Sequence, residues 1–223
     1  MIEQTVVKHN IQKNILSTLM HQKTARFRDM RPPRVDTNLY SYHLTQLLKG
    51  GMVKKVDDGY TLDVAGLIYV DRVNEDKLFV RNQPKIVTMF VIQNSEGDIL
   101  LQRRTKQPFI DSWNLPNGKL HNDDANVHMA ARREAREKLG VVDQEMRHAG
   151  DCYIRVTQNG EQVILTLAHV FAFYRDNIET NEHTQWMRPH KLMQLDLAPG
   201  VEQIMTRTFF RDPFYFEEFE HNC

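Results

Sequence analysis

The sequence has little cysteine, no net charge and no long apolar run. Its two cysteines, Cys152 and Cys223, are too few for a disulfide framework or for a metal cluster built on thiolates. No apolar run approaches the ~18 residues that a membrane-spanning helix needs, and residues 1–13 lack the apolar stretch of a secretory signal. These absences exclude a secreted, membrane-spanning or zinc-ribbon protein, and we expect a cytoplasmic protein with no membrane partner.

The zero net charge hides an uneven distribution. Residues 1–55 carry ten basic and three acidic side chains, which is a net charge of +7, and the rest of the chain carries −7. This division favours two modules with different partners, and the basic module is suited to a polyanion. A solvated basic face without a partner explains the charge equally well.

Residues 1–73 have the pattern of helices followed by a β-hairpin. Three segments are expected to be helical: 8–21, 37–49 and 63–73. In the second of these, Leu39 and Leu44 are expected to face the core. Asp58-Gly59 separates two short alternating runs, which is a strong hairpin signal. Helices followed by a hairpin wing are typical of a winged helix-turn-helix, and we predict this domain over 1–73.

Three stretches resemble the recognition helix and wing of ArsR-type winged-helix regulators: 41–44, 51–53 and 58–62. In such a domain the second helix of the motif enters the major groove and the wing contacts phosphates. The resemblance implies base contacts from exposed side chains that include Asn38, Tyr40 and Ser41. It implies phosphate contacts from six basic side chains: Arg26, Arg28, Arg31, Arg34, Lys54 and Lys55. Winged helices also serve dimerisation and protein docking, and this alternative stays open.

A polar linker is expected over 74–85, and a second domain over 86–223. Strand-like runs occupy four segments of this domain: 86–93, 99–103, 150–156 and 162–174. Helices are expected over 126–139, which ends at Gly140, and over 198–208.

From Leu100 onward the chain resembles a Nudix domain. The box of that family is Gly-x5-Glu-x7-Arg-Glu-U-x-Glu-Glu-x-Gly-U, where U is an apolar residue, and here it runs from Gly118 to Gly140 with Arg133-Glu134 at its Arg-Glu pair. The resemblance implies an α/β/α sandwich with a mixed sheet. Combined with the N-terminal domain, it predicts an α+β chain made of a winged helix-turn-helix and a Nudix-like sandwich.

The box departs from the family pattern at two places. Its later glutamate pair falls on Glu137 and Lys138, so the residue four positions after Glu134 is a lysine. The loop acid falls on Asp124 when counted from the first glycine, and on Ala125 when counted from the helix, so the loop is one residue longer. The resemblance implies Glu134 and Glu137 as catalytic residues and, together with Asp124, as metal ligands.

The lysine changes the expected chemistry. Carboxylates at i, i+3 and i+4 share one helix face and hold divalent cations against a diphosphate. A Glu134–Lys138 pair is close to neutral, and its ammonium can take the place of the metal. Four residues are then candidates for binding a diphosphate directly: Arg104, Gly118, Arg133 and Lys138. A catalytic site would use Mg²⁺ or Mn²⁺, whereas a binding site would need no cofactor.

Three functions are compatible with the sequence. The favoured one is a ligand-responsive regulator that binds double-stranded DNA and whose degenerate Nudix domain binds a nucleotide diphosphate of the ADP-ribose type. The second is a Mg²⁺-dependent pyrophosphohydrolase of nucleoside diphosphates linked to another group, and the third is a protein-interaction scaffold. A homodimer is expected. Known regulators that combine these two modules place the Nudix domain first, so the order here is reversed.

Overall fold

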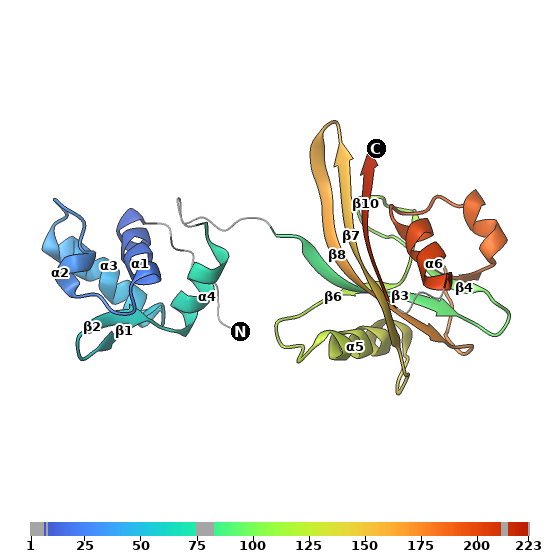
Figure 1. Cartoon of the computed structure of the whole chain (residues 1–223), viewed down its shortest axis with the longest axis horizontal. Helices are drawn as coiled ribbons and strands as arrows, with labels where there is room; N and C mark the ends of the chain where they lie inside the picture. The colour runs from blue at the N-terminus through green and yellow to red at the C-terminus, as the bar shows by residue number, and fades with distance from the viewer. Residues whose placement is uncertain (1–6, 8, 75–82, 211–213, 223) are drawn as a thin grey trace. The chain divides into compact units, whose positions relative to one another are not determined.

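The chain forms two compact units, Met1–Asn82 and Gln83–Cys223 (Figure 1). The computed structural model describes residues 7, 9–74, 83–210 and 214–222. Most of the expected linker, over 75–82, lies outside the described residues. No described helix is long and apolar enough to cross a membrane.

The N-terminal unit has the element order of a winged helix-turn-helix. Its elements are α1 (Asn10–His21), α2 (Phe27–Met30), α3 (Thr37–Lys49), β1 (Val53–Val56), β2 (Gly59–Leu62) and α4 (Val64–Arg72). The core is apolar, and its fully buried side chains come from α1 and α3: Ile15, Leu16, Tyr40 and Leu47. Burial of such side chains is worth about 1.5–3 kcal/mol each, which holds these short helices together.

Helix α3 buries a different face from the one expected. Asp36 caps its first turn, and four residues at helical spacing form its buried face: Tyr40, His43, Leu44 and Leu47. Leu39 is 47 % exposed, so its expected core position was wrong, as was the exposed base-contact role of Tyr40. The apolar stripe begins one residue later than expected, because the Tyr40 ring packs edge-on against Phe27 with ring centroids 4.8 Å apart.

The wing is a tight hairpin that packs against the chain before α2. Val56 pairs with Gly59, so the turn lies at Asp57-Asp58, one residue earlier than expected. Tyr60 exchanges two 3.0 Å backbone hydrogen bonds with Ala25. Gly59 has φ 146°, and a Cβ there would lie 2.4 Å from the Ala25 carbonyl oxygen. Only glycine permits this close approach.

The C-terminal unit is built on one mixed sheet. Its strands are β3 (Lys85–Gln93), β4 (Ile99–Arg103), β5 (Trp113–Asn114), β6 (Asn117–Lys119), β7 (Arg147–Gln158), β8 (Glu161–Tyr174), β9 (Thr184–Met187) and β10 (Tyr215–Asn222). The order is β10-β7-β8-β3-β4-β5, with β6 on β3 and β9 on β4. Two neighbouring pairs are parallel, β10 with β7 and β3 with β8, whereas the others are antiparallel. The expected mixed sheet is confirmed.

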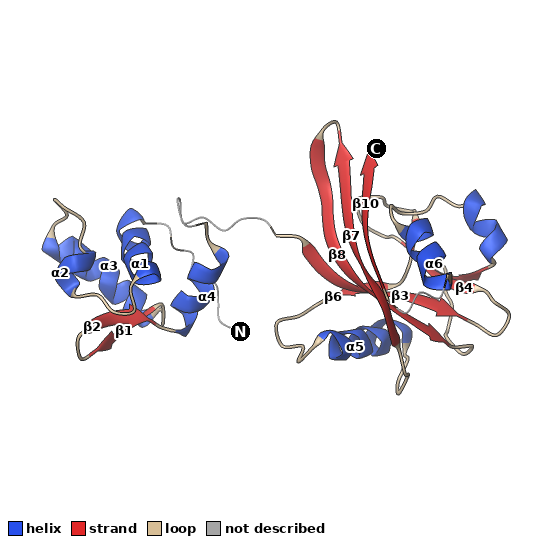
Figure 2. Cartoon of the chain, viewed as in Figure 1, coloured by secondary structure: helices blue, strands red, loops and turns tan. Residues whose placement is uncertain are grey.

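Helices cover both faces of this sheet (Figure 2). Helix α5 (Val127–Leu139) packs through alanines on one face, against Phe90 and Phe171. Helix α6 (Val201–Phe209) packs on the other face, against Met89 and Ile154, and follows the short helix η1 (Pro189–Gln194). Adjacent residues of β3 therefore face opposite helices, as the strand period of two requires. The α/β/α sandwich is confirmed.

Helix α5 has strong end signals. The side chain of Asn126 accepts a 3.0 Å hydrogen bond from the Met129 amide, and Gly140 ends the helix in the left-handed conformation. The expected helix over 126–139 therefore begins one residue later, because Asn126 is its cap. Helix α6 also starts later than expected, at Val201 rather than 198.

Candidate functional site

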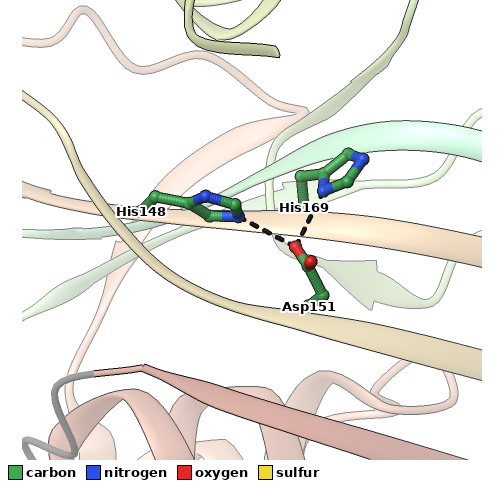
Figure 3. A group of neighbouring side chains, drawn as sticks. All are labelled: His148, Asp151 and His169. Carbon is green, nitrogen blue, oxygen red and sulfur yellow. Dashed lines mark hydrogen bonds and ion pairs between the residues drawn. The ribbon is translucent and has the colours of Figure 1, made fainter.

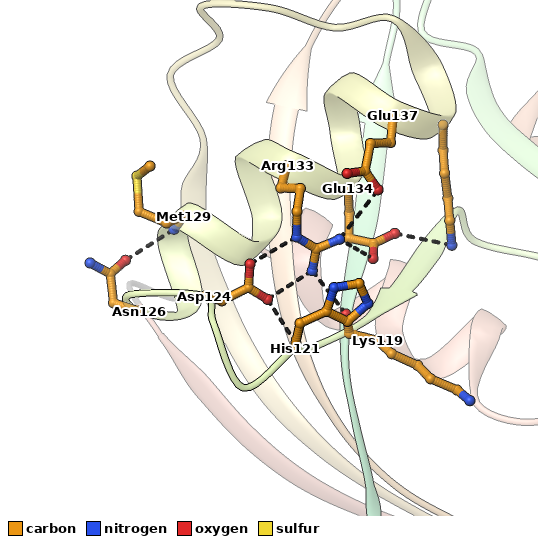
Figure 4. Close-up of polar contacts among 9 residues, drawn as sticks. Lys119, His121, Asp124, Asn126, Met129, Arg133, Glu134 and Glu137 are labelled. Carbon is orange, nitrogen blue, oxygen red and sulfur yellow. Dashed lines mark hydrogen bonds and ion pairs between the residues drawn. The ribbon is translucent and has the colours of Figure 1, made fainter. Parts of the chain in front are cut away.

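The loop between β6 and α5 is held to the helix by one guanidinium group (Figure 4). Arg133 binds the Asp124 carboxylate with two hydrogen bonds of 2.8 and 2.7 Å. Its Nη1 donates at 2.7 Å to Glu134 Oε1 and at 3.3 Å to Glu137 Oε2. Its Nη2 also donates to the Lys119 carbonyl oxygen. One arginine thus connects all three acidic residues that the sequence assigns to metal binding.

Lys138 supplies a second cation to the same cluster. Its Nζ lies 3.1 Å from Glu134 Oε2, an ion-pair contact without hydrogen-bond geometry, and donates a hydrogen bond to the Asn117 carbonyl oxygen. The Glu134 side chain is only 5 % exposed, so its charge must be compensated by neighbours. A Cβ on Gly118 would lie 1.7 Å from Glu134 Oε2. Glycine at 118 therefore makes room for the carboxylate.

The electrostatics of this cluster favour permanent charges. Hydrogen bonds from Arg133 hold the pKa of Asp124 at about 2; burial opposes this effect, and the His121 amide supports it. The Asp124 hydrogen bonds in turn raise the pKa of Arg133 above its usual range. Both groups are therefore charged across the physiological range, and their ion pair is partly shielded from water.

A cavity on the α6 face of the sheet adjoins this cluster. Lys85 and Arg104 contribute two cations to a lining that also includes Met89, Phe109 and Asn117. Burial lowers the pKa of both cations, and for Lys85 the charges of Arg104 and Lys119 add to the effect. Asn117 links the two regions, because it lines the cavity and its carbonyl oxygen accepts from Lys138. The two cations of this cavity, whose volume is about 50 Å³, are suited to a small anionic group of a ligand.

Lys85 was missed by the sequence analysis. The apolar run that predicts the strand begins at Ile86. Lys85 precedes this run and was therefore assigned to the polar linker. The strand in fact starts at Lys85, which pairs with Thr166 of the parallel strand β8. A strand period of two places Lys85 on the same face as Val87, but only the folded chain brings Lys85 and Arg104 into the lining of one cavity.

The residues assigned to DNA contact lie on the surface of the N-terminal unit. Seven are exposed and Ser41 is half-buried: Arg26, Arg28, Arg31, Arg34, Asn38, Ser41, Lys54 and Lys55. Arg31 donates a hydrogen bond to Thr37 at the start of α3. Arg28 pairs with Asp29 at 3.5 Å, and Lys54 pairs with the half-buried Asp63 at 3.7 Å. Their contacts with DNA stay a prediction.

A second polar cluster was also missed, on the α5 face of β7 and β8 (Figure 3). Asp151 Oδ1 lies 2.8 Å from His148 Nε2 and 2.7 Å from His169 Nδ1. Asp151 and His169 are paired across the two strands, which a correct register would have revealed. His148 joins them through a β-bulge that no sequence signal marked.

A mixed sheet lies between helices, and a glycine loop leads into a helix of charged residues, so the class of protein is an α/β/α sandwich with a charged loop-helix motif. The family model of the NUDIX domain matches residues 82–208, which is more than half of the chain. The chain therefore belongs to the Nudix family.

Individual relatives agree with this assignment. The chain is 25% identical over 130 residues to the ADPR responsive transcriptional repressor NtrR of Acinetobacter baylyi; the match covers 56% of this chain and 52% of NtrR. The chain thus spans about half the length of the curated relative it matches.

Solved structures show the same fold. The NUDIX domain of Shewanella oneidensis NrtR, complexed with ADP ribose, is similar with a TM-score of 0.50 and 17% identity, over 65% of this chain and 97% of that one. The MutT protein from Bacillus halodurans has a TM-score of 0.50 and 18% identity, over 61% and 89% of the two chains. The ArsR-like character of the N-terminal unit stays a prediction.

The box residues do not fit a divalent cation in their present arrangement. Nudix hydrolases in general need Mg²⁺ or Mn²⁺. Here each oxygen of Glu134 faces a cation of the chain itself, Arg133 on one side and Lys138 on the other. Glu137, whose side chain is 56 % exposed, also contacts Arg133. A metal at Glu134 would have to displace an ammonium or a guanidinium group, and its positive charge would be repelled by the other.

Proposed function

We propose that this chain is a ligand-responsive DNA-binding regulator. In this proposal the winged helix over 1–73 binds duplex DNA, and the Nudix domain over 86–223 binds a nucleotide diphosphate of the ADP-ribose class. The observation that carries the proposal is the double compensation of Glu134 by Arg133 and Lys138. It favours binding of a diphosphate over its hydrolysis.

The cations next to the cavity suit the phosphates of such a ligand. Lys138, Arg104 and Lys85 supply positive charge around Asn117, and charged donors make the stronger hydrogen bonds to phosphate oxygens. Arg133 is already engaged with three carboxylates, so we assign it to holding the loop. Gly118 is assigned to the close packing of that loop on Glu134.

The relatives support the ligand class. NtrR is described as an ADPR-responsive repressor, and the NrtR NUDIX domain was solved with ADP ribose. The N-terminal unit supports the DNA partner, because residues 1–55 carry a net charge of +7 and six basic side chains near α3 and the wing are exposed: Arg26, Arg28, Arg31, Arg34, Lys54 and Lys55. A regulator of this kind would work in the cytoplasm, and we expect it to bind DNA as a homodimer.

Ligand binding is tested by the melting temperature of the full chain with and without ADP-ribose. We expect a rise in the wild type, and an affinity about 10–100-fold weaker in Lys138→Gln, because a hydrogen bond to a charged group is lost. Lys191→Gln, which removes an exposed lysine of the same unit, should bind like the wild type. Equal loss in both variants would contradict the role of Lys138.

Measurement of ADP-ribose hydrolysis distinguishes a ligand-binding regulator from a pyrophosphohydrolase. We expect no ADP-ribose hydrolysis with Mg²⁺ or Mn²⁺ in the wild type, and a gain in Lys138→Glu, which restores the i+4 carboxylate. Hydrolysis near the ordinary ~1–10³ s⁻¹ that disappears in Glu134→Gln would overturn the proposal in favour of an enzyme.

DNA binding is tested with a labelled pool of random-sequence duplexes at several salt concentrations. Combined Arg31→Ala and Arg34→Ala should weaken binding and lower the slope of log affinity against log salt by about 2. The control variant Arg132→Ala with Arg136→Ala removes the same charge from the C-terminal unit, and it should change neither the affinity for DNA nor the salt slope. If neither duplex nor ADP-ribose binds the wild type, a scaffold role is favoured.

A further inference from the structure

The three side chains His148, Asp151 and His169 form a compact set of metal-binding atoms. Their nitrogen and oxygen atoms all lie within 4.8 Å of one another, and in the described ranges this is the only group of three or more histidine, cysteine or acidic side chains that does so. The set is separate from the box, whose acidic residues contact Arg133 instead. Two imidazoles and one carboxylate are ligands that divalent transition metals prefer.

The backbone brings these side chains together through an irregular strand. His148 and Asp151 are three residues apart on β7, so a regular strand would point them to opposite faces of the sheet. The register of β7 against β8 shifts between His148 and Gly150, which marks a β-bulge. The extra residue turns both side chains to the same face, where His169 lies directly across from Asp151. Bulges commonly redirect side chains near functional sites.

Neighbouring aromatic rings hold the His148 ring in place, and all three side chains remain partly accessible to solvent. The His148 ring stacks on Phe171 with a centroid distance of 4.8 Å, and Phe214 lies edge-on at 5.2 Å. The side chains of the three ligands are 25 %, 23 % and 16 % exposed. An ion there could therefore keep one position for water while three protein atoms hold it.

We propose that His148, Asp151 and His169 bind a divalent transition-metal ion of the zinc type. Tetrahedral coordination with bonds of about 2.0–2.2 Å places ligand atoms about 3.3 Å apart, so the two contacts to Asp151 open by about half an ångström. The ion binds the lone pairs of His148 Nε2 and His169 Nδ1, and the proton of each neutral imidazole sits on its other ring nitrogen. The hard ions Mg²⁺ and Ca²⁺, which prefer oxygen ligands, are bound poorly.

The test is metal binding by the full chain without a histidine tag, after treatment with a chelator. Zn²⁺ is titrated by calorimetry, and Co²⁺ is followed by its visible absorption bands. We expect one ion per chain and visible bands typical of four-coordinate cobalt. His169→Gln and Asp151→Asn should each weaken Zn²⁺ binding by more than about 100-fold, because a direct ligand contributes more than the outer partners of ligands.

His128→Gln is the matched control. His128 lies against the same cluster, with its ring centroid 5.9 Å from that of His148 and 5.2 Å from that of Phe171, but is not one of the three ligands. The His128→Gln variant should keep the wild-type affinity for Zn²⁺.

Circular dichroism of the metal-free variants checks that each is folded. Asp151→Asn preserves the shape of the side chain, so it tests the site if a histidine variant is unfolded. Binding that persists in both ligand variants, or that Mg²⁺ matches, would overturn the proposal; loss only in the ligand variants would support it.

Discussion

Two clusters of the Nudix unit each contain carboxylates surrounded by nitrogen atoms, yet their partners differ in kind. Around Asp124 and Glu134 the partners are the guanidinium group of Arg133 and the side-chain nitrogen of Lys138, which form ion pairs with the carboxylates. Around Asp151 the partners are the ring nitrogens of two histidines, which can also coordinate a metal ion.

Burial explains why the two clusters differ. The side chains of Glu134 and Asp124 are 5 % and 8 % exposed, so an unpaired charge there would be costly and a fixed cation is needed at all times. The Asp151 side chain is 23 % exposed, so water can solvate its negative charge when a histidine moves away from it. The buried cluster is therefore suited to fixing a loop, and the partly exposed cluster is suited to the exchange of an ion.

Removal of the central guanidinium should have the largest effect. In Arg133→Gln the carboxylates of Asp124 and Glu134 lose their main partner while still largely buried. We expect the free energy of unfolding to fall by about 3–5 kcal/mol, measured by urea denaturation. Arg136→Gln, an exposed arginine of the same helix, should change it by no more than about 0.5 kcal/mol.

The same variant sharpens the comparison of the clusters. Without the guanidinium the box resembles an open carboxylate site, so Mg²⁺ should raise the melting temperature of Arg133→Gln more than that of the wild type. An equal rise in both proteins would show that Arg133 does not control access of the cation.

Substitution of Gly118 should have the next largest effect. In Gly118→Ala the new Cβ would overlap Glu134 Oε2, so either the loop or the carboxylate must shift. We expect a loss of about 1–3 kcal/mol, which is usual for overpacking, together with weaker ADP-ribose binding. An unchanged denaturation midpoint would mean that the loop moves freely.

Acid should weaken the buried cluster in a defined range of pH. The folded pKa of Asp124 is about 2, below its ordinary value of about 3.9, so the folded state binds this proton more weakly than the unfolded state. The contribution is complete above about pH 4 and is lost as the pH falls toward about 2. Denaturation midpoints measured across this range should fall less steeply in Asp124→Asn than in the wild type.

Asp151→Asn should have the smallest effect on stability. Its two hydrogen bonds are partly exposed, so we expect a loss of about 1 kcal/mol or less in the metal-free protein. A loss as large as that of Arg133→Gln would contradict the comparison, because it would show that the exposed cluster is also structural.

The position of the Nudix box could be predicted from the sequence. The spacing from Gly118 to Gly140 predicted the loop and the helix, and the lysine at 138 predicted the ion pair with Glu134 that the structure contains. The ion pair depends on two residues four positions apart on one helix, which sequence spacing specifies directly.

The buried face of α3 was harder to predict. Leu39 and Tyr40 are adjacent, and either could begin an apolar stripe. Packing of Tyr40 against Phe27, a residue of another element, decided between them. Hydrophobic spacing identifies a helix more reliably than it fixes the rotation of that helix.

The sequence by itself predicted two units from its charge distribution and local periodicity. Its resemblance to the Nudix family implied the mixed-sheet sandwich, and the fixed spacing of the family's motif located the substituted box. Only the tertiary structure decided that Arg133 connects three carboxylates, that Lys85 lies beside Arg104, and that His148, Asp151 and His169 meet. These contacts depend on strand register, on a bulge and on a loop folding back onto its helix. A shift of one residue in register reverses the face on which a side chain lies, and no local signal in the sequence fixes it.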